Sequence, residues 1–309
     1  MQQMKKILVI GSSNVDLITS VDHFPKPGET IEGQSFTQAM GGKGANQALS
    51  AFRAGGDVKF ITCLGNDSFG RIALQSYHEE GLNVSLSKIC NDTPTGKATI
   101  WVDREGENSI IIIPGANQKL TPDYIEMIQQ EIELADFIVL QMEIPYQTVQ
   151  LVCEIGSKFG KKIILNAAPA YPLDNEILQS LYILLVNKSE IEIITGMKIE
   201  TDGEQELIAT LLDKGVENVI LTLGSKGSLF KNREASIHTP AFEVTVTDTT
   251  AAGDTFCGAL AAEISRNGDI GQVLRFATAA AALCVTRLGA QPSIPSKSEI
   301  HRFLESQPS

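Results

Sequence analysis

The sequence predicts an α/β fold with a doubly wound, mostly parallel central sheet flanked by helices, and a small antiparallel β lid formed by two insertions. Three observations lead to this prediction: short runs rich in β-branched residues, amphipathic segments between them, and two stretches that alternate polar and apolar residues. The runs lack polar alternation, which is typical of strands covered on both faces of a parallel sheet. Because strand and helix patterns alternate along the chain, helices are expected on both faces.

Six apolar runs are expected to form the strands of the central sheet: "KILVIG", "VKFITCLG", "DFIVLQME", "KKIILNAAP", "YILLVN" and "NVILTLG". Amphipathic segments between them predict helices. "ANQALSAFRAG" places Ala45, Leu49 and Phe52 on one side and ends at a Gly-Gly pair. "DSFGRIALQSYHEEGL" and "PYQTVQLVCEIGSKFG" have the same pattern and also reach a glycine, which is a frequent helix stop.

Two segments interrupt this alternation of strands and helices. Residues 15–40 contain prolines and a glycine turn, and residues 94–113 alternate around a charged turn. A period of two fits antiparallel strands with one solvated face. We therefore expect a main α/β domain of residues 1–14, 41–93 and 114–309. The two insertions are expected to form one small subdomain that acts as a lid, as a dimer surface, or as both.

The composition limits the class of partner. The 309 residues have a formal net charge of −12, and the isoelectric point is about 4.9. Such an acidic surface repels phosphate backbones, so nucleic acid and anionic membranes are not expected as partners. No stretch approaches the length of a membrane span. The five cysteines form no C-x-x-C pair, which favours buried structural thiols and a cytoplasmic location.

The segment "AMGGKGANQALSAFRAGG" is the first strong functional signal, since Walker, dinucleotide-binding, zinc-protease and serine-hydrolase motifs are absent. Gly41, Gly42 and Gly44 would let the backbone approach a ligand closely, and Lys43 adds positive charge where a helix begins. Asn46 falls on the first turn of that helix. The alternative is a plain glycine turn before a helix.

The second signal is "DTTAAGDTFCGAL". Phe256, Leu260 and Ile264 recur at helical spacing, so a helix is expected from about Asp254. The preceding backbone N–H groups would lack intrahelical partners and form an anion-sized pocket with a carboxylate at its rim. The alternative is that Asp254 simply caps the helix, although a capping box would need Glu or Gln where Cys257 stands.

Together the two motifs resemble those of the ribokinase family of sugar and nucleoside kinases. The resemblance extends from "VIGSSNVDLIT" to "TRLGAQPSIP", nearly the whole chain. It implies ATP-dependent phosphorylation of the primary 5-hydroxyl of D-ribose, which gives ribose 5-phosphate and ADP. In this family pattern Asp254 is the catalytic base, and the backbone N–H groups of Ala251, Ala252 and Gly253 form the anion hole for the transferred phosphate.

The resemblance also assigns the sugar-binding positions: Asn14, Asp16, Gly42, Lys43, Asn46, Glu143 and Asp254. These carboxylates and amides suit a polyol. Asn14 and Asp16 could instead belong to an ordinary turn, and Glu143 could be a plain strand-end carboxylate. An apolar residue is expected at position 14 in deoxyribokinases, so Asn14 favours ribose. The remaining alternatives are a deoxyribokinase, a kinase for another small sugar or nucleoside, and a sugar-binding regulator without kinase activity.

For the nucleotide, the resemblance implies Asn187, Thr222, Gly224, Ser225, Gly227, Gly253 and Thr278 as ATP-binding positions. In "VNKSE", Glu190 would act on Mg²⁺ through water. Here Val186 and Lys188 depart from the proline and glutamate of the family pattern, and Lys188 reverses a charge near the expected metal.

A potassium site is implied as well, mostly through backbone carbonyls, at Asp248, Thr250, Cys284, Arg287, Gly289 and Ser293. The expected cofactors are therefore ATP, Mg²⁺ and K⁺. Exposed strand edges need covering, so the lid is expected to form a homodimer.

Overall fold

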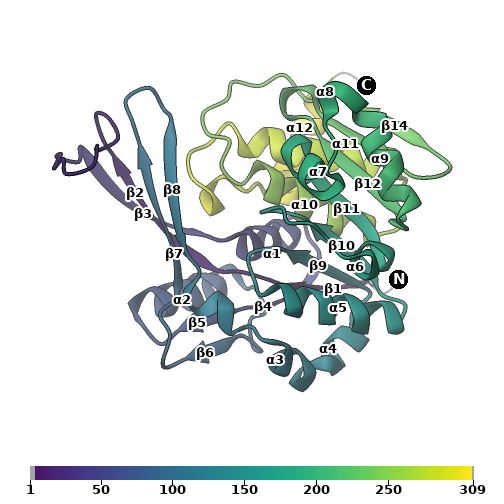
Figure 1. Ribbon diagram of the computed structural model, residues 1–309, viewed down its shortest axis with the longest axis horizontal. Helices are drawn as coiled ribbons and strands as arrows, with labels where there is room; N and C mark the ends of the chain where they lie inside the picture. Colours follow the sequence, from purple (N-terminus) through teal and green to yellow (C-terminus); the bar gives the residue numbers. More distant parts are fainter. Residues whose placement is uncertain (1–3, 308–309) are drawn as a thin grey trace.

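The computed structural model describes residues 4–307 and confirms the predicted fold class (Figure 1). An eight-stranded sheet has the order β14-β13-β12-β11-β10-β9-β1-β4, in which the six strands from β12 to β4 are parallel and the β13 and β14 pairings are antiparallel. The strands are β1 (Lys6–Ile10), β4 (Asp57–Ile61), β9 (Phe137–Gln141), β10 (Lys162–Asn166), β11 (Leu181–Asn187), β12 (Asn218–Thr222), β13 (Ser228–Lys231) and β14 (Ser236–Thr239).

Helices cover both faces of this sheet, because its strands are apolar on both sides. In β1, Leu8 and Ile10 face one core, and Ile7 and Val9 face the other. The first core contains residues of α3 (Pro122–Met127), α4 (Gln129–Leu134), α5 (Tyr146–Lys158), α6 (Asn175–Ser180), α7 (Lys188–Thr195) and α9 (Glu204–Asp213). The second contains residues of α1 (Lys43–Arg53), α2 (Ser68–Glu80), α10 (Ala252–Ile264), α11 (Ile270–Cys284) and α12 (Lys297–Ser306).

Four strands form a separate sheet that projects from the α/β domain (Figure 1). They are β2 (Asn14–Ser20), β3 (Ser35–Gly41), β7 (Gly96–Val102) and β8 (Asn108–Ile113), in the order β3-β2-β7-β8. The outer pairs are antiparallel hairpins. The central pair, β2 and β7, is parallel and joins the two insertions. We call this sheet the lid.

One predicted strand is divided in the structure. The run "VKFITCLG" was expected to be a single strand of the central sheet, but β4 ends at Ile61 and β5 (Cys63–Gly65) leaves to pair with β6 (Lys88–Cys90). The run is apolar throughout, so its pattern does not reveal the break. Gly65 fits closely there, since a Cβ on it would lie 2.4 Å from the nitrogen of Thr95.

The parallel strands place their carboxyl ends along one edge, where ligands bind in open α/β sheets. The glycine-rich turn before α1, the loop after β9, the start of α7 after β11 and the start of α10 all lie near this edge, and the lid rises beside it (Figure 1). Among the helices of residues 4–307, none combines the length and apolarity needed to cross a bilayer.

Candidate active site

Hydrogen bonds to Glu143 and Ser12 hold the glycine-rich turn before α1. Gly42 has a φ of +91°, a backbone conformation that favours glycine. The N–H of Lys43 donates to Oε2 of Glu143 at 3.0 Å, and the N–H of Gly44 donates to Oγ of Ser12 at 3.2 Å. The hydroxyl of Ser12 in turn donates to the same Glu143 oxygen at 2.6 Å. The first amides of α1 therefore hold the loop in place and are not open to an anion.

The amino end of α10 is different, because some of its amides lack partners in the described chain. The helix begins at Ala252, two residues before the expected start at Asp254, and Ala251 has a left-handed φ of +60°. The N–H of Ala252 donates to the carbonyl of Thr249 at 3.2 Å. Within residues 4–307, the N–H groups of Ala251 and Gly253 have no acceptor. Two of the three expected amides are thus available to an anion.

A cavity of about 230 Å³ opens in front of these amides. Its lining includes Lys43, Asn187, Glu190, Thr222 and residues 251–254. The pKa of the Lys43 ammonium is raised, chiefly by the Asp254 carboxylate, against the opposing effect of burial. A cavity with one cation, free amides and the positive end of a helix dipole suits a phosphate-sized anion.

Asp254 does not cap its own helix. It is the third residue of α10, and the N-cap Ala251 makes no side-chain cap. The side chain is only 6 % exposed and accepts hydrogen bonds from Nδ2 of Asn46 at 3.0 Å and from Nε2 of Gln47 at 2.9 Å. Both donors lie on α1, so the carboxylate joins two helices at the edge of the cavity. The simple capping interpretation is therefore wrong.

Asp16 is a buried carboxylate without a hydrogen-bond donor among the residues that the structure describes. Burial raises its pKa from 3.8 to about 7, and the negative charges of Glu143 and Asp254 add to the effect. A Cβ on Gly41 would lie 2.2 Å from its Oδ2, so the glycine leaves room for the carboxylate. A ligand that offers hydroxyl donors would satisfy this group.

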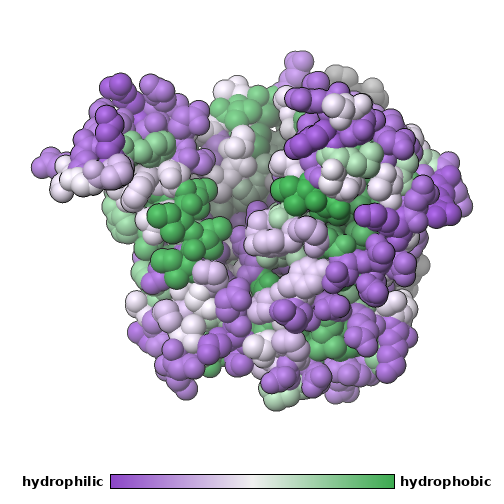
Figure 2. All heavy atoms as spheres, in the orientation of Figure 1, coloured by the Kyte–Doolittle hydropathy of each residue, from purple (hydrophilic) through white to green (hydrophobic). Residues whose placement is uncertain are grey.

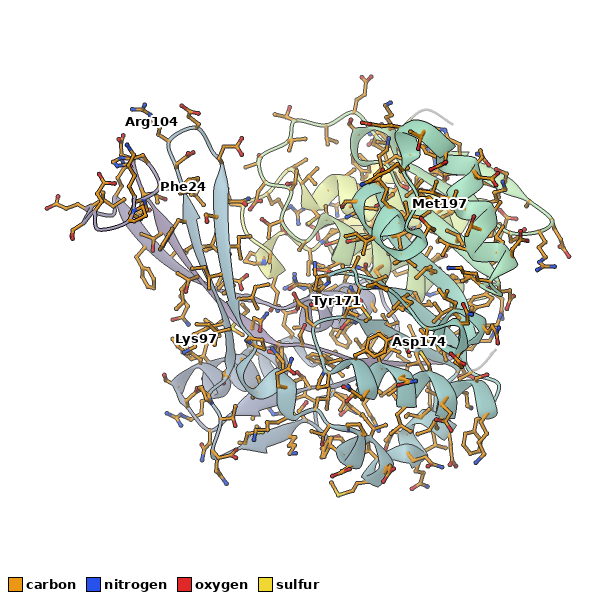
Figure 3. The ribbon with its side chains drawn as sticks, viewed as in Figure 1. Phe24, Lys97, Arg104, Tyr171, Asp174 and Met197 are labelled. Carbon is orange, nitrogen blue, oxygen red and sulfur yellow. The ribbon has the colours of Figure 1, made fainter. Side chains whose placement is uncertain are left out.

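Asn14 lies beside Asp16 at the start of β2 and is 3 % exposed. Its Oδ1 accepts a hydrogen bond from Nδ2 of Asn117 at 2.7 Å, and Oδ1 of Asn117 accepts from the N–H of Ser13 at 2.9 Å. These hydrogen bonds fix the orientation of the Asn14 amide. Within residues 4–307 its Nδ2 has no acceptor, so it can donate to a ligand. Asn14 and Glu143 also border a second hollow of about 540 Å³. Tyr171 lines that hollow and lies between the lid and the α/β domain (Figure 3).

Asn187 and Glu190 form a capping box at the start of α7. Oδ1 of Asn187 accepts from the N–H of Glu190 at 2.9 Å, and Oε2 of Glu190 accepts from the N–H of Asn187 at 2.7 Å. Burial raises the pKa of Glu190. Lys188 extends to Glu204 on α9, with a distance of 2.9 Å between Nζ and Oε1. Its charge is paired there, and the cavity lining does not include it.

The remaining predicted nucleotide positions are only partly brought together. Thr222 lines the cavity, and its hydroxyl donates to the carbonyl of Val186 at 3.3 Å. Ser225 lies in the short helix η2 (Gly224–Lys226), outside the cavity lining. Thr278 lies on α11, where its hydroxyl donates to the carbonyl of Leu274 at 2.8 Å.

The positions expected to hold potassium lie together, with one side chain turned away. Oδ1 and Oδ2 of Asp248 accept from the N–H groups of Thr250 and Gly289 at 2.8 and 2.9 Å. Sγ of Cys284 lies 3.6 Å from the carbonyl oxygen of Thr250 and 3.0 Å from the hydroxyl of Ser293. The guanidinium of Arg287 pairs with Glu299. Residues 4–307 contain no cluster of three His, Cys, Asp or Glu side chains suited to a metal.

Four residues of the site were missed from the sequence: Ser12, Gln47, Asn117 and Gln141. Ser12 falls within "VIGSSNVDLIT", where the family resemblance begins, and Gln47 falls within "AMGGKGANQALSAFRAGG", so proximity to these segments was a usable signal. Asn117 stands in a segment without any motif. Gln141 lies in the expected strand "DFIVLQME", two residues before Glu143, and only its tertiary contacts reveal its place in the site.

Residues 4–297 match the pfkB family of carbohydrate kinases. A ribokinase of Haemophilus influenzae is 39% identical over 302 residues, which is 97% of this chain and 99% of that protein. A deoxyribokinase of Salmonella typhi is 38% identical over 300 residues, 96% of this chain and 98% of that protein. A solved structure of Arabidopsis thaliana ribokinase complexed with ribose and ATP is 33% identical. The structural match covers 99% of this chain and 100% of the Arabidopsis chain, with a TM-score of 0.92.

The fold and the site thus define a phosphoryl-transfer enzyme of the α/β class. The chain belongs to the pfkB family of carbohydrate kinases, since the match covers nearly its whole length. This confirms the resemblance identified in the sequence.

Proposed function

We propose that this protein is an ATP-dependent kinase that transfers the γ-phosphate of ATP to the 5-hydroxyl of D-ribose. The main support is the buried Asp254 carboxylate, held by two amides of α1 next to the open N–H groups of α10 and a cavity of phosphate size. Relatives named ribokinase at up to 39% identity, and a related structure with ribose and ATP, support the choice of sugar and nucleotide.

In the proposed reaction, the oxygen of the sugar hydroxyl attacks the γ-phosphorus, and Asp254 accepts the hydroxyl proton. The bond from the γ-phosphorus to the bridging oxygen of ATP breaks, and ADP leaves with that oxygen. The N–H groups of Ala251 and Gly253 and the Lys43 ammonium stabilise the negative charge on the transferred phosphate. The N–H of Ala252 already donates to Thr249, so it joins this group only if that turn loosens. Fixed donors that stabilise this charge contribute much of the rate acceleration in phosphoryl transfer. Positioning of the hydroxyl matters more there than its prior deprotonation.

Asn14 and Asp16 are proposed to recognise the sugar hydroxyls. Within the described residues, the NH₂ group of Asn14 has no acceptor and the Asp16 carboxylate has no donor, so both can pair with sugar hydroxyls. An additional ribose hydroxyl would pair with the Asn14 amide, whereas deoxyribose would leave that amide unsatisfied. Ribose is therefore favoured over deoxyribose, although a deoxyribokinase is 38% identical.

Mg²⁺ and K⁺ are proposed as cofactors. One oxygen of Glu190 is used in the capping box, and the other remains for a water ligand of Mg²⁺, which would neutralise phosphate charge when bound. The loop of Asp248 and Thr250 and the end of α11 at Cys284 offer carbonyl and carboxylate oxygens for K⁺ directly behind the start of α10. The five free, buried thiols support a cytoplasmic location.

A homodimer through the lid is proposed as well. Ile110, Ile111, Ile112 and Ile113 of β8 are 43–53% exposed, and Phe36 is 65% exposed. Figure 2 shows a hydrophobic group over β7 and β8. An exposed apolar strand at a sheet edge needs a cover, and a second lid supplies one. Sedimentation as a monomer at micromolar concentration would contradict this assignment.

The central experiment measures ATP consumption with pentoses, hexoses and nucleosides in the presence of Mg²⁺ and K⁺. D-Ribose should give the highest kcat/KM, and Asp254→Asn should lower kcat between about a hundredfold and ten-thousandfold, because proton acceptance is lost. A sugar-binding regulator would bind ribose without consuming ATP. Near-normal kcat in the Asp254→Asn variant would remove the base from the mechanism.

A further inference from the structure

A chain of buried amides runs from the central sheet to Asp254. Nε2 of Gln141, the last residue of β9, donates to Oε1 of Gln47 at 2.8 Å. Nε2 of Gln47 then donates to Oδ1 of Asp254 at 2.9 Å. Both glutamine side chains are fully buried. Neither glutamine lines either of the two hollows around the site.

The chemistry of the carboxylate fixes the direction of this chain. A carboxylate only accepts hydrogen bonds, so Gln47 must turn its NH₂ group toward Asp254. Its carbonyl then faces Gln141, which must also present its NH₂ group. The consequence is visible at the far end, where Oε1 of Gln141 is buried without a partner in the described chain. Neither amide can reverse without placing two carbonyls, or a carbonyl and the carboxylate, against each other.

Close backbone packing holds the chain in register. A Cβ on Gly258 of α10 would lie 2.4 Å from the carbonyl oxygen of Gln47, so α1 and α10 are in direct contact there. A Cβ on Gly11 would lie 1.9 Å from Oε1 of Gln141, so this side chain is confined as well. Side chains confined in this way have little freedom to choose another hydrogen-bond pattern.

We propose that Gln47, oriented by Gln141, is a positioning residue that holds the Asp254 carboxylate in the orientation needed to receive the proton of the sugar hydroxyl. The inference rests on the proposed role of Asp254 and extends it to two residues that reach no ligand. Asn46 holds the second oxygen of Asp254. Together the two amides leave each carboxylate oxygen one further acceptor site for the substrate.

The test compares Gln141→Met with Gln141→Glu. Methionine removes the donor to Gln47 and also removes the unpartnered Gln141 oxygen, so the fold should be retained. Glutamate keeps the size but attracts the NH₂ group of Gln47, so the Gln47 carbonyl would turn toward Asp254. Asn218→Leu and Asn218→Asp are matched controls. Asn218 is a buried amide with the same kind of hydrogen bonds elsewhere in the protein: it accepts from Asn232 and donates to the carbonyl of Tyr182.

The Gln141→Met variant should lower kcat about tenfold, while the KM values for ribose and ATP stay within about threefold. Gln141→Glu should lower kcat by about tenfold more, because a carbonyl then faces the carboxylate. The Asn218 variants should keep kcat. Thermal unfolding of each variant separates loss of fold from loss of positioning, and Gln47→Met provides a second route if Gln141→Met does not fold.

Equal kcat values for the wild type and both Gln141 variants would overturn the proposal, and so would a Gln141→Glu variant more active than Gln141→Met. Asp254→Asn is measured in parallel. If it loses activity while the Gln141 and Gln47 variants do not, only the positioning role fails. If it stays active, the proposed base fails and the positioning role fails with it.

Discussion

The affinity for ribose should increase with pH, because Asp16 must be ionised to accept hydrogen bonds from the sugar. Burial and the charges of Glu143 and Asp254 raise the pKa of Asp16 from 3.8 to about 7. The described part of the chain offers it no donor in compensation. Sugar hydroxyls that donate to the carboxylate favour the charged form, so binding should lower this pKa and release a proton near neutral pH.

The magnitude follows from the size of the shift. A rise of about three pKa units means that ionising Asp16 costs ~4 kcal/mol more than in water. If bound ribose lowers the pKa of Asp16 by about one unit, the affinity for ribose should be about tenfold higher well above pH 7 than well below pH 7. Folding has the opposite dependence on pH. The pKa is raised in the folded state, so this group lowers the free energy of unfolding as pH rises from about 4 to 7, with no further change above.

Calorimetric titration of the nucleotide-free protein with D-ribose, from pH 5.5 to 8.5, measures this effect. Repetition in buffers of different ionisation enthalpy counts the protons released. The Asp16→Asn variant is the control, since it keeps the size but cannot titrate, and it should bind weakly with a flat pH profile. A flat profile in the wild type, or an unchanged slope in Asp16→Asn, would refute the reasoning.

Three further predictions concern neighbouring features. Gly41→Ala should weaken ribose binding about tenfold in calorimetry, because the new Cβ would lie 2.2 Å from Oδ2 of Asp16; unchanged affinity would show that the carboxylate moves freely. Lys188→Ala should change the Mg²⁺ dependence of kcat by less than about twofold, since Lys188 pairs with Glu204 at a half-exposed site. A larger change would mean that its charge reaches the phosphates. K⁺ should raise kcat well above the value in Na⁺ at equal ionic strength, and equal rates would argue against the proposed cation site.

The fold class could be predicted from the sequence because it depends on local patterns. Apolar runs without polar alternation give strands that are buried on both faces, as in β1 and β9. Glycine stops marked helix ends, such as Gly81 after α2, with a φ of +82°. The same local reasoning failed for "VKFITCLG", where a change of pairing partner divides an apolar run. A pairing partner is a property of the sheet, so the sequence pattern does not contain it.

The start of α10 shows where sequence reasoning ends. The sequence placed a carboxylate and free amides near residue 254, because helix starts leave N–H groups unpaired. It could not tell a cap from a base, since that choice depends on what the carboxylate contacts. In the structure those contacts come from Asn46 and Gln47, more than 200 positions away in the chain.

The sequence by itself determined the order of strands and helices and the positions of the two glycine-rich motifs. Periodicity and backbone freedom act over a few residues, so both can be read from neighbours in the chain. The tertiary structure decided which groups of residues 4–307 are left unsatisfied: Asp16 without a donor, and two amides at the start of α10 without acceptors. Whether a polar group finds a partner depends on packing between distant segments, and it is the groups without partners that a ligand can satisfy.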